Sequence, residues 1–285
     1  MILDGKKLAG KIEDELKKKI QALDEVPCLA VILIGEDPAS KAYVGQKMKS
    51  CQRLGMTSKS FEMEDEITTE ELCDLIKGLN QDEGVHGILV QLPLPNHIDK
   101  GKVLDTISPL KDVDGFQPMN VGMMMVGHPA LEPCTPRGVM RLLDEYKIDL
   151  AGKDAVVVGK GNITGKPLAM MLMNRDATVT VCHILTKDLK SYTQKADIII
   201  SCAGSPNLIK DDMVKEGAVV VDVGYSRVDD PKKDKGYSIV GDVEFEKIKE
   251  KASFITPVPG GVGPMTVAIL MENTYLAYNL QNEKS

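Results

Sequence analysis

The stretch Ala155–Gly165, AVVVGKGNITG, decides the fold of the second half of this 285-residue chain. Its β-branched, apolar start predicts a buried strand, and its three glycines predict a tight turn before a helix. This order is typical of an α/β unit that binds a nucleotide, because glycines let the backbone approach a pyrophosphate and the helix N-terminus supplies amide donors. The spacing GxGxxxG is one residue longer than the common dinucleotide pattern. A turn that binds no ligand is the alternative, although the surrounding elements favour a nucleotide site.

Further strand-like runs alternate with helices on both sides of this stretch. Those that follow it predict a doubly wound, Rossmann-like sheet: Thr178–Cys182, Asp197–Ala203, Ala218–Gly224 and Ser253–Val258. In the first half, strands are predicted at Cys28–Gly35, Thr57–Met63 and Gly87–Leu94, and helices at Pro38–Leu54 and after a capping box that begins at Thr68. Strands and helices that alternate with short links indicate parallel sheets. The chain is therefore predicted to be an α/β protein.

Two features divide the chain into domains. From Asn120 to Pro136 the periodicity fails, and methionine, glycine and proline crowd together, which indicates a boundary or a crossing between domains. The last segment, Pro264–Gln281, predicts a helix that is long enough to return to the first domain. We therefore predict one domain of residues 1–120 plus 270–285 and a second, dinucleotide-binding domain of residues 121–269.

Composition excludes several classes of function. A net charge of −7 without a basic stripe argues against a nucleic-acid partner. No apolar run approaches the roughly 20 residues that a membrane span needs, and the charged start predicts no signal peptide, so we expect a cytoplasmic protein with no membrane partner. The six cysteines form no CxxC pair, and the four histidines are not at metal-ligand spacing. We expect reduced thiols and no metal.

A tyrosine and a lysine mark the end of the first predicted strand. Tyr43 and Lys47 are four residues apart in the helix that follows this strand, so they share one face, one turn apart. A phenol and an amine at the carboxyl end of a strand are a plausible proton-handling pair. Because most helix lysines are simply solvated, this interpretation depends on the other motifs.

Three further motifs offer polar groups or an unusual backbone. Gln91, at the end of Gly87–Leu94, can donate and accept hydrogen bonds at a crevice, or it can merely end the strand. The aspartates of KDVDGF, Lys111–Phe116, are ordinary turn residues unless one carboxylate binds the NH groups of a heterocycle. Thr256–Thr266 has three glycines and three prolines between a strand and the last helix. That segment either holds a ligand or forms a rigid hinge.

Five motifs in this order resemble those of the bifunctional methylenetetrahydrofolate dehydrogenase/cyclohydrolases, the FolD family. They are Tyr43-Val44-x-x-Lys47-x-Lys49 with Gly55, Gly87–Pro95, Lys111–Phe116, Pro133-Cys134-Thr135-Pro136-x-Gly138 and Pro259–Thr266. The match covers nearly the whole chain. The resemblance implies two α/β domains joined by two long helices with the active cleft between them, and a homodimer through the dinucleotide-binding domain.

The resemblance also implies two folate activities. They are oxidation of 5,10-methylenetetrahydrofolate to the 5,10-methenyl form with NADP, and hydrolysis of that product to 10-formyltetrahydrofolate. By position, Lys47 would be the base of the hydrolysis and Gln91 its partner. Tyr43 would pack on the folate rings, and Asp114 would anchor the pterin. The substrate site would also include Val90, Leu92, Pro259, Gly260, Gly261, Val262 and Gly263. The cofactor would contact Thr135, Gly159, Lys160, Gly161, Ile184 and Tyr225.

Three positions depart from the family's usual pattern, and all belong to the expected cofactor site. Gly161 and Ile184 stand where serine is common, and Tyr225 lies in an altered Gly-Ile-Asn motif. No acid directly follows the strand that ends near His183, which argues against a strict NAD site, while Lys160 can reach a 2′-phosphate. NADP is the expected cofactor, with NAD possible. The alternatives are a cyclohydrolase alone, an NAD-using variant, a binding protein without turnover, and an unrelated dehydrogenase that uses His183.

Overall fold

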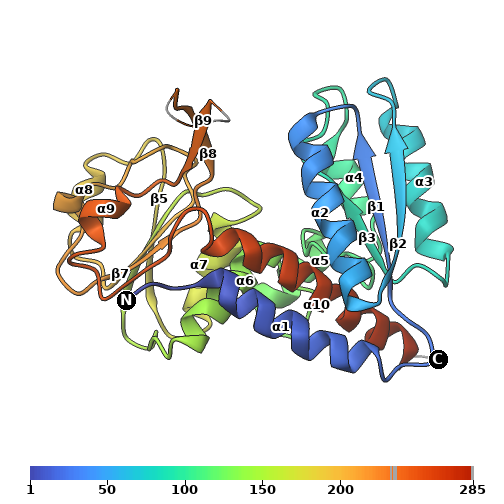
Figure 1. The fold of residues 1–285 in the computed structure, drawn as a ribbon, viewed down its shortest axis with the longest axis horizontal. Helices are drawn as coiled ribbons and strands as arrows, with labels where there is room; N and C mark the ends of the chain where they lie inside the picture. The colour runs from blue at the N-terminus through green and yellow to red at the C-terminus, as the bar shows by residue number, and fades with distance from the viewer. Residues whose placement is uncertain (232, 234–235, 284–285) are drawn as a thin grey trace. The chain divides into compact units, whose positions relative to one another are not determined.

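The computed structural model describes residues 1–231, 233 and 236–283 (Figure 1). They form two compact units. Unit 1 comprises residues 1–9, 125–127 and 135–266, and unit 2 comprises residues 10–124, 128–134 and the described chain from residue 267. Each unit has its own parallel sheet and its own apolar core. The prediction of two α/β domains is confirmed.

Unit 2 is built on a sheet of three parallel strands. They are β1 (Cys28–Ile34), β2 (Thr57–Met63) and β3 (Gly87–Val90), in the order β2-β1-β3. Every residue of β1 and β3 is buried, as expected for continuous apolar runs, whereas edge strand β2 is largely accessible. β3 ends at Val90, four residues before the predicted end, because Pro93 and Pro95 lack the amide hydrogen that a sheet ladder uses.

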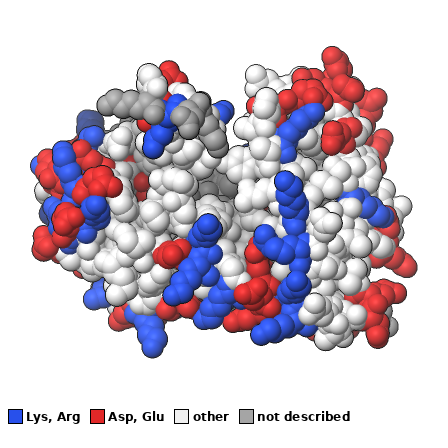
Figure 2. Space-filling view, viewed as in Figure 1, with Lys and Arg blue, Asp and Glu red and all other residues white. Residues whose placement is uncertain are grey.

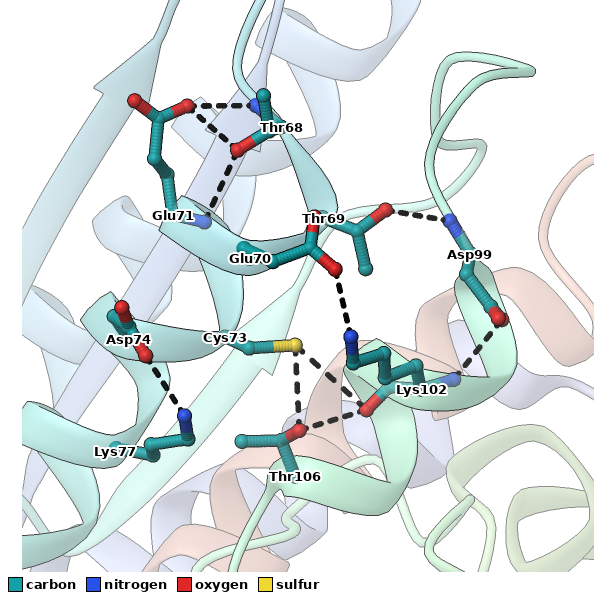
Figure 3. Close-up of polar contacts among 10 residues, drawn as sticks. All are labelled: Thr68, Thr69, Glu70, Glu71, Cys73, Asp74, Lys77, Asp99, Lys102 and Thr106. Atoms are coloured by element: carbon teal, nitrogen blue, oxygen red, sulfur yellow. Dashed lines mark hydrogen bonds and ion pairs between the residues drawn. The ribbon is translucent and has the colours of Figure 1, made fainter.

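The helices of unit 2 begin and end at the signals in the sequence. Helix α2 (Pro38–Leu54) starts where the Asp37 carboxylate accepts the Ser40 amide at 2.7 Å, and it ends at Gly55, whose φ is 84°. Helix α3 (Thr69–Gln81) opens with the predicted capping box between Thr68 and Glu71 (Figure 3). Helix α5 (Pro118–Met125) overlaps the stretch from Asn120 to Pro136, in which the sequence shows no helical periodicity. Part of that stretch is therefore helical.

Side chains join α3 to helix α4 (Lys100–Thr106), as Figure 3 shows. The Lys102 ammonium pairs with Glu70 at 2.7 Å, and the Asp99 amide donates to Thr69 Oγ1 at 3.0 Å. Thr106 Oγ1 lies 3.4 Å from Cys73 Sγ. These contacts cover the outer side of the unit 2 core, whose members include Leu72, Ile76 and Val103.

Unit 1 is built on a sheet of five parallel strands. They are β4 (Asp154–Val158), β5 (Thr178–Cys182), β6 (Ile198–Ser201), β7 (Val219–Asp222) and β10 (Phe254–Ile255), in the order β10-β7-β6-β4-β5. Every strand that the sequence predicts for this half is present. A separate antiparallel pair, β8 (Ser226–Asp229) with β9 (Tyr237–Val240), was not predicted. The helices are α6 (Cys134–Glu145), α7 (Gly165–Met173), α8 (Leu189–Thr193) and α9 (Phe245–Ile248), with a 3-10 turn at Asp211–Met213.

Two long helices carry the chain from one unit into the other. Helix α1 (Gly5–Ile20) begins in unit 1 and ends in unit 2, and helix α10 (Val262–Asn282) does the same (Figure 1). This confirms the expectation of two α/β domains joined by two long helices. The start of α1 packs closely on the loop before α10, because the Lys6 amide donates to the Gly260 carbonyl oxygen at 3.0 Å.

Two glycines of α1 test this close packing. A Cβ atom at Gly5 would lie 1.8 Å from the Gly261 carbonyl oxygen, whereas no described atom lies within 4 Å of one at Gly10. We expect Gly5→Ala to lower the free energy of unfolding by about 1–3 kcal/mol, because backbone must move. The matched control Gly10→Ala should raise it by up to about 1 kcal/mol through helix propensity. Urea unfolding measures both, and equal effects would contradict the packing described.

Candidate active site

A lysine and a glutamine that are far apart in the sequence meet at the carboxyl ends of β1 and β3. Lys47 Nζ, from α2, donates to Gln91 Oε1 at 2.9 Å, and both side chains are half-buried. The glutamine is fixed on its other side. Its backbone amide donates to the Ile32 carbonyl at 2.8 Å, and its Nε2 donates to the Leu92 carbonyl at 2.6 Å. The amide oxygen is therefore presented to the lysine.

Helix α2 also supplies the local charge and an exposed aromatic ring. Tyr43 lies one turn before Lys47, and 41% of it is exposed. The helix contains four basic residues and no acidic one, and Figure 2 shows Lys and Arg side chains along it. Lys41 and Arg53 are paired with Glu36 and Glu13. These two pairs offset part of the positive charge of the helix.

Asp112 shapes the loop between α4 and α5. It is 1% exposed, and its carboxylate accepts the amides of Gly115 at 3.2 Å and Gln117 at 2.8 Å, and the Asn120 side chain at 3.0 Å. Burial raises the pKa of Asp112 to about 6, and these hydrogen bonds oppose the rise. Asp112 is thus the turn residue of the KDVDGF motif.

The other aspartate of that motif lies close enough to Lys47 for the two charges to interact. Burial raises the pKa of Asp114, and the positive charge of Lys47 opposes the rise, as does a hydrogen bond with Cys134. Lys47, Gln91 and Asp114 therefore form one group within unit 2, hereafter the Lys47 cluster. Of the two neighbours that were predicted with them, Val90 is only 3% exposed, whereas Leu92 is half-buried, as Lys47 and Gln91 are.

Asn273 of α10 fixes this loop, a role that no motif in the sequence predicted. Asn273 is fully buried, and its Nδ2 donates to the carbonyl oxygens of Val113 and Glu132, both at 2.9 Å. Cys134 Sγ lies 3.2 Å from the same Val113 oxygen. Asn273 is one of four amide side chains in α10, and it closely follows the apolar run Val267–Met271. Its place near that run was the signal, because a buried polar side chain needs partners.

The segment Pro259–Gly263 belongs to unit 1 and is braced by the start of α1. Pro259 and Gly263 are exposed and Gly260 is half-buried, whereas Gly261 and Val262 are buried. A Cβ atom at Gly261 would lie 2.6 Å from the Pro257 carbonyl oxygen. Gly261 is therefore required by the chain's own packing, and the exposed members are the ones that a ligand can contact.

In the glycine-rich loop between β4 and α7, Gly159 and Gly165 are packed against other backbone, whereas the space beside Gly161 is open. Gly159 has a φ of 124°, and a Cβ atom at Gly165 would lie 2.0 Å from its carbonyl oxygen. No described atom lies within 4 Å of a Cβ atom at Gly161, which is exposed together with Lys160. The open side lies next to the N-terminus of α7, so the residues present fit the phosphates of a dinucleotide.

The remaining predicted cofactor residues all lie in unit 1. Ile184, after β5, is 95% exposed, and Tyr225, after β7, is 55% exposed. Thr135 Oγ1 lies 3.0 Å from Thr266 Oγ1. His183 holds its own turn, because its Nδ1 accepts the Leu185 amide at 3.2 Å.

Two other kinds of site are absent from the described residues. Among them, no group of three or more His, Cys, Asp or Glu side chains could hold a metal ion. Within the same residues, no helix is both long and apolar enough to cross a membrane.

Two family models match the chain. Residues 3–114 match the catalytic domain of tetrahydrofolate dehydrogenase/cyclohydrolase, and residues 133–282 match its NAD(P)-binding domain.

Known proteins are similar over nearly the whole chain. The bifunctional protein FolD of Campylobacter jejuni subsp. jejuni is 55% identical over 277 residues, which is 96% of each chain. A crystal structure of the C. jejuni bifunctional enzyme FolD has a TM-score of 0.95 at 54% identity and covers 99% of each chain. The Trypanosoma brucei methylenetetrahydrofolate dehydrogenase-cyclohydrolase, in complex with NADP and an inhibitor, has a TM-score of 0.95 at 40% identity. That alignment covers 99% of this chain and 98% of the other.

The raised pKa of Asp112 predicts how pH affects stability. Between pH 4 and pH 6 the unfolded chain has lost this proton, whose usual pKa is 3.8, while the folded chain keeps it. The wild type therefore loses stability as pH rises, by about 3 kcal/mol from this group. Asp112→Asn removes this titrating group. The difference in free energy of unfolding, wild type minus variant, should therefore fall by about 3 kcal/mol between pH 4 and pH 7. Denaturant unfolding at several pH values measures it, and a constant difference would contradict the assignment.

Proposed function

Since the chain belongs to the tetrahydrofolate dehydrogenase/cyclohydrolase family, we propose that it oxidises 5,10-methylenetetrahydrofolate to the 5,10-methenyl form with NADP and hydrolyses that product to 10-formyltetrahydrofolate. The observation that carries the proposal is the 2.9 Å hydrogen bond from Lys47 Nζ to Gln91 Oε1 beside Asp114. This bond joins an amine to an amide at the end of β3, and the charge of Lys47 acts on the carboxyl group of Asp114. Folate derivatives are thus the substrate class.

Lys47 acts in the hydrolysis as a base. Water attacks the cationic methenyl carbon, and the proton that this water must lose passes to the neutral lysine amine. A C–N bond of the five-membered ring then breaks: the hydroxyl group of the adduct loses its proton and becomes the formyl carbonyl, and the leaving nitrogen takes up a proton. The formyl group stays on the other nitrogen, and one proton is released overall. The cation of the bound substrate disfavours a charged lysine nearby. Gln91 orients the amine, because its oxygen accepts one N–H and leaves the lone pair available for the water.

Asp114 and Tyr43 bind rather than react. A carboxyl group can hold the NH groups of the pterin, and the exposed Tyr43 ring can stack on an aromatic part of the substrate. Val90, Leu92 and the exposed members of Pro259–Gly263 complete the proposed substrate contacts.

The oxidation needs positioning more than acid or base chemistry. When bound, NADP accepts the hydride that the methylene carbon loses. The glycine loop Gly159–Gly161 and the N-terminus of α7 bind its phosphates, and Lys160 meets the 2′-phosphate. Thr135, Ile184 and Tyr225 are the other proposed contacts.

The alternatives are less well supported. A cyclohydrolase alone and an NAD-using variant are not favoured, because the NAD(P)-binding model matches and a 40% identical structure contains NADP. A protein without turnover would have no need of a lysine that is held by Gln91. An unrelated dehydrogenase would need His183 to react, yet its Nδ1 holds the turn at Leu185.

Three further expectations, on the domain bounds, the location and the oligomeric state, are retained as proposals. Residues 1–120 plus 270–285 form the folate domain, and residues 121–269 form the dinucleotide domain. The protein is cytoplasmic, as the composition suggests. It forms a homodimer through the dinucleotide domain, where edge strand β5 offers an apolar side chain, Val181, that is 38% exposed.

The homodimer predicts a change of mass. Val181→Lys places a charge on the exposed edge strand and should shift the sedimenting species from two chains to one. The control Met119→Lys alters another exposed apolar side chain, in unit 2, and should leave the mass unchanged. Analytical ultracentrifugation distinguishes them. A monomeric wild type, or a dimer that survives Val181→Lys, would argue against this interface.

The two activities are tested together with methylenetetrahydrofolate and NADP. The wild type should produce NADPH without accumulating the methenyl form. Lys47→Ala should lower the hydrolysis rate about 10²–10⁴-fold, so that methenyltetrahydrofolate accumulates while NADPH still forms. Lys47→Arg should behave similarly, because arginine keeps the charge but does not give up a proton. Both absorbances are followed over time.

Lys41→Ala in the same helix is the control for these variants. It removes only an exposed ion pair with Glu36 and should hydrolyse at the wild-type rate within about two-fold. Near-normal hydrolysis by Lys47→Ala would refute the base role. A wild type that does not reduce NADP would refute the dehydrogenase.

A further inference from the structure

Two buried aspartates lie at the carboxyl edge of the unit 1 sheet, outside every residue set considered above. Asp222 ends β7 and is 3% exposed, and Asp242 follows β9 and is fully buried. Ionisable side chains are rarely buried to this extent unless they are hydrogen-bonded. Their partners are almost all backbone amides of loops at this edge.

Asp242 holds the loop that follows β6. Its Oδ2 accepts the amides of Ala203 at 2.7 Å and Gly204 at 3.2 Å, and the Ser201 hydroxyl at 2.9 Å. Its Oδ1 accepts the Ser205 amide at 2.8 Å. A carboxylate can take this many donors, and a neutral amide side chain cannot, because one of its two polar atoms is itself a donor.

Asp222 in turn holds Asp242. Its Oδ1 accepts the amides of Gly224 at 2.8 Å and Asp242 at 2.9 Å, and its Oδ2 accepts the Val243 amide at 2.9 Å. Burial raises the pKa of Asp222 to about 6, against the effect of these three donors. The two carboxyl groups are therefore linked in series through the backbone of residue 242.

Neighbouring glycines leave room for both carboxylates. A Cβ atom at Gly224 would lie 2.3 Å from Asp242 Oδ1, and one at Gly241 would lie 1.9 Å from Asp222 Oδ2. Gly224 directly precedes the exposed Tyr225. The same contacts therefore fix where the chain leaves β7 toward that tyrosine.

The loop held by Asp242 also borders the glycine-rich loop. A Cβ atom at Gly159 would lie 2.6 Å from the Cys202 carbonyl oxygen and 2.8 Å from its Sγ. The Cys202 amide donates to the Val158 carbonyl at 2.8 Å. The position of residues 202–205 thus limits where the backbone of Gly159 can lie.

We propose that Asp222 and Asp242 are positioning residues for the dehydrogenase: they hold residues 202–205 against Gly159 and direct the chain toward Tyr225, so that the dinucleotide meets a pre-arranged backbone. The inference rests on the proposed function, since it concerns how the cofactor site of that enzyme is kept in shape. Pre-arranged donors bind more tightly because no ordering cost falls on the binding step. Neither aspartate is expected to touch the cofactor.

The test compares cofactor binding with hydrolysis in the same full-length variants. Asp242→Asn should raise the Kd for NADP, measured by calorimetry, at least ten-fold, and Ser201→Ala should raise it by a smaller factor. Hydrolysis of added methenyltetrahydrofolate, whose proposed residues lie in unit 2, should stay within about two-fold of wild type. A role in overall folding would lower both activities together.

Asp197→Asn is the matched control. Asp197 accepts the Asp154 amide at 2.9 Å and pairs with Lys215 at 2.5 Å, at the opposite, amino edge of the same sheet. This variant should leave the Kd for NADP and the hydrolysis rate unchanged.

Hydrogen exchange without cofactor gives a readout that is independent of activity. Amides of residues 203–205 should exchange faster in Asp242→Asn than in wild type, and not in Asp197→Asn. An unchanged Kd in Asp242→Asn and Ser201→Ala, or parallel loss of NADP binding and hydrolysis, would overturn the inference. The wild type could bind no NADP while the amides of residues 203–205 still exchange faster in Asp242→Asn. That result would refute NADP as the cofactor, but it would support the role of Asp242 in holding this loop.

Discussion

Backbone amides of the loops beside the two parallel sheets need acceptors, and buried aspartates supply them in both units. These loop amides make no sheet ladder, so they would otherwise be buried without partners at a considerable cost. Asp112 accepts the amides of Gly115 and Gln117 in unit 2, and Asp242 accepts those of Ala203 and Ser205 in unit 1. The loops that carry the candidate chemistry are held by these carboxylates.

The groups that hold the loops in place are different from the groups that are proposed to bind substrate or to react. In KDVDGF one aspartate is occupied by loop amides, and the other, Asp114, is left to face Lys47. Gln91 is likewise fixed by two hydrogen bonds of its own before it accepts from the lysine. Rigid supports of this kind matter because a base must be held within hydrogen-bond reach of the proton that it takes.

Glycines serve two different purposes in this chain, and spacing alone does not distinguish them. Gly5, Gly165 and Gly241 are required because backbone or carboxylate atoms occupy the place of a side chain. At Gly161 no described atom occupies that place, so the space on that side is available to a ligand. The three glycines of the pattern GxGxxxG cannot be distinguished from the sequence, whereas the atoms around each glycine in the structure show that their roles differ.

The sequence by itself determined the strand runs, the capped helices α2 and α3, and the motif residues, because periodicity, caps and turn chemistry are local properties. Helix α5 was missed within a stretch rich in methionine and glycine, and the β8–β9 pair lacked a strong alternating pattern. Only the tertiary structure decided which polar residues meet, since Lys47 and Gln91 lie 44 positions apart and Ser201 and Asp242 lie 41 apart. Such contacts depend on which strands become neighbours in a sheet, and strand order is fixed by the packing of the whole unit.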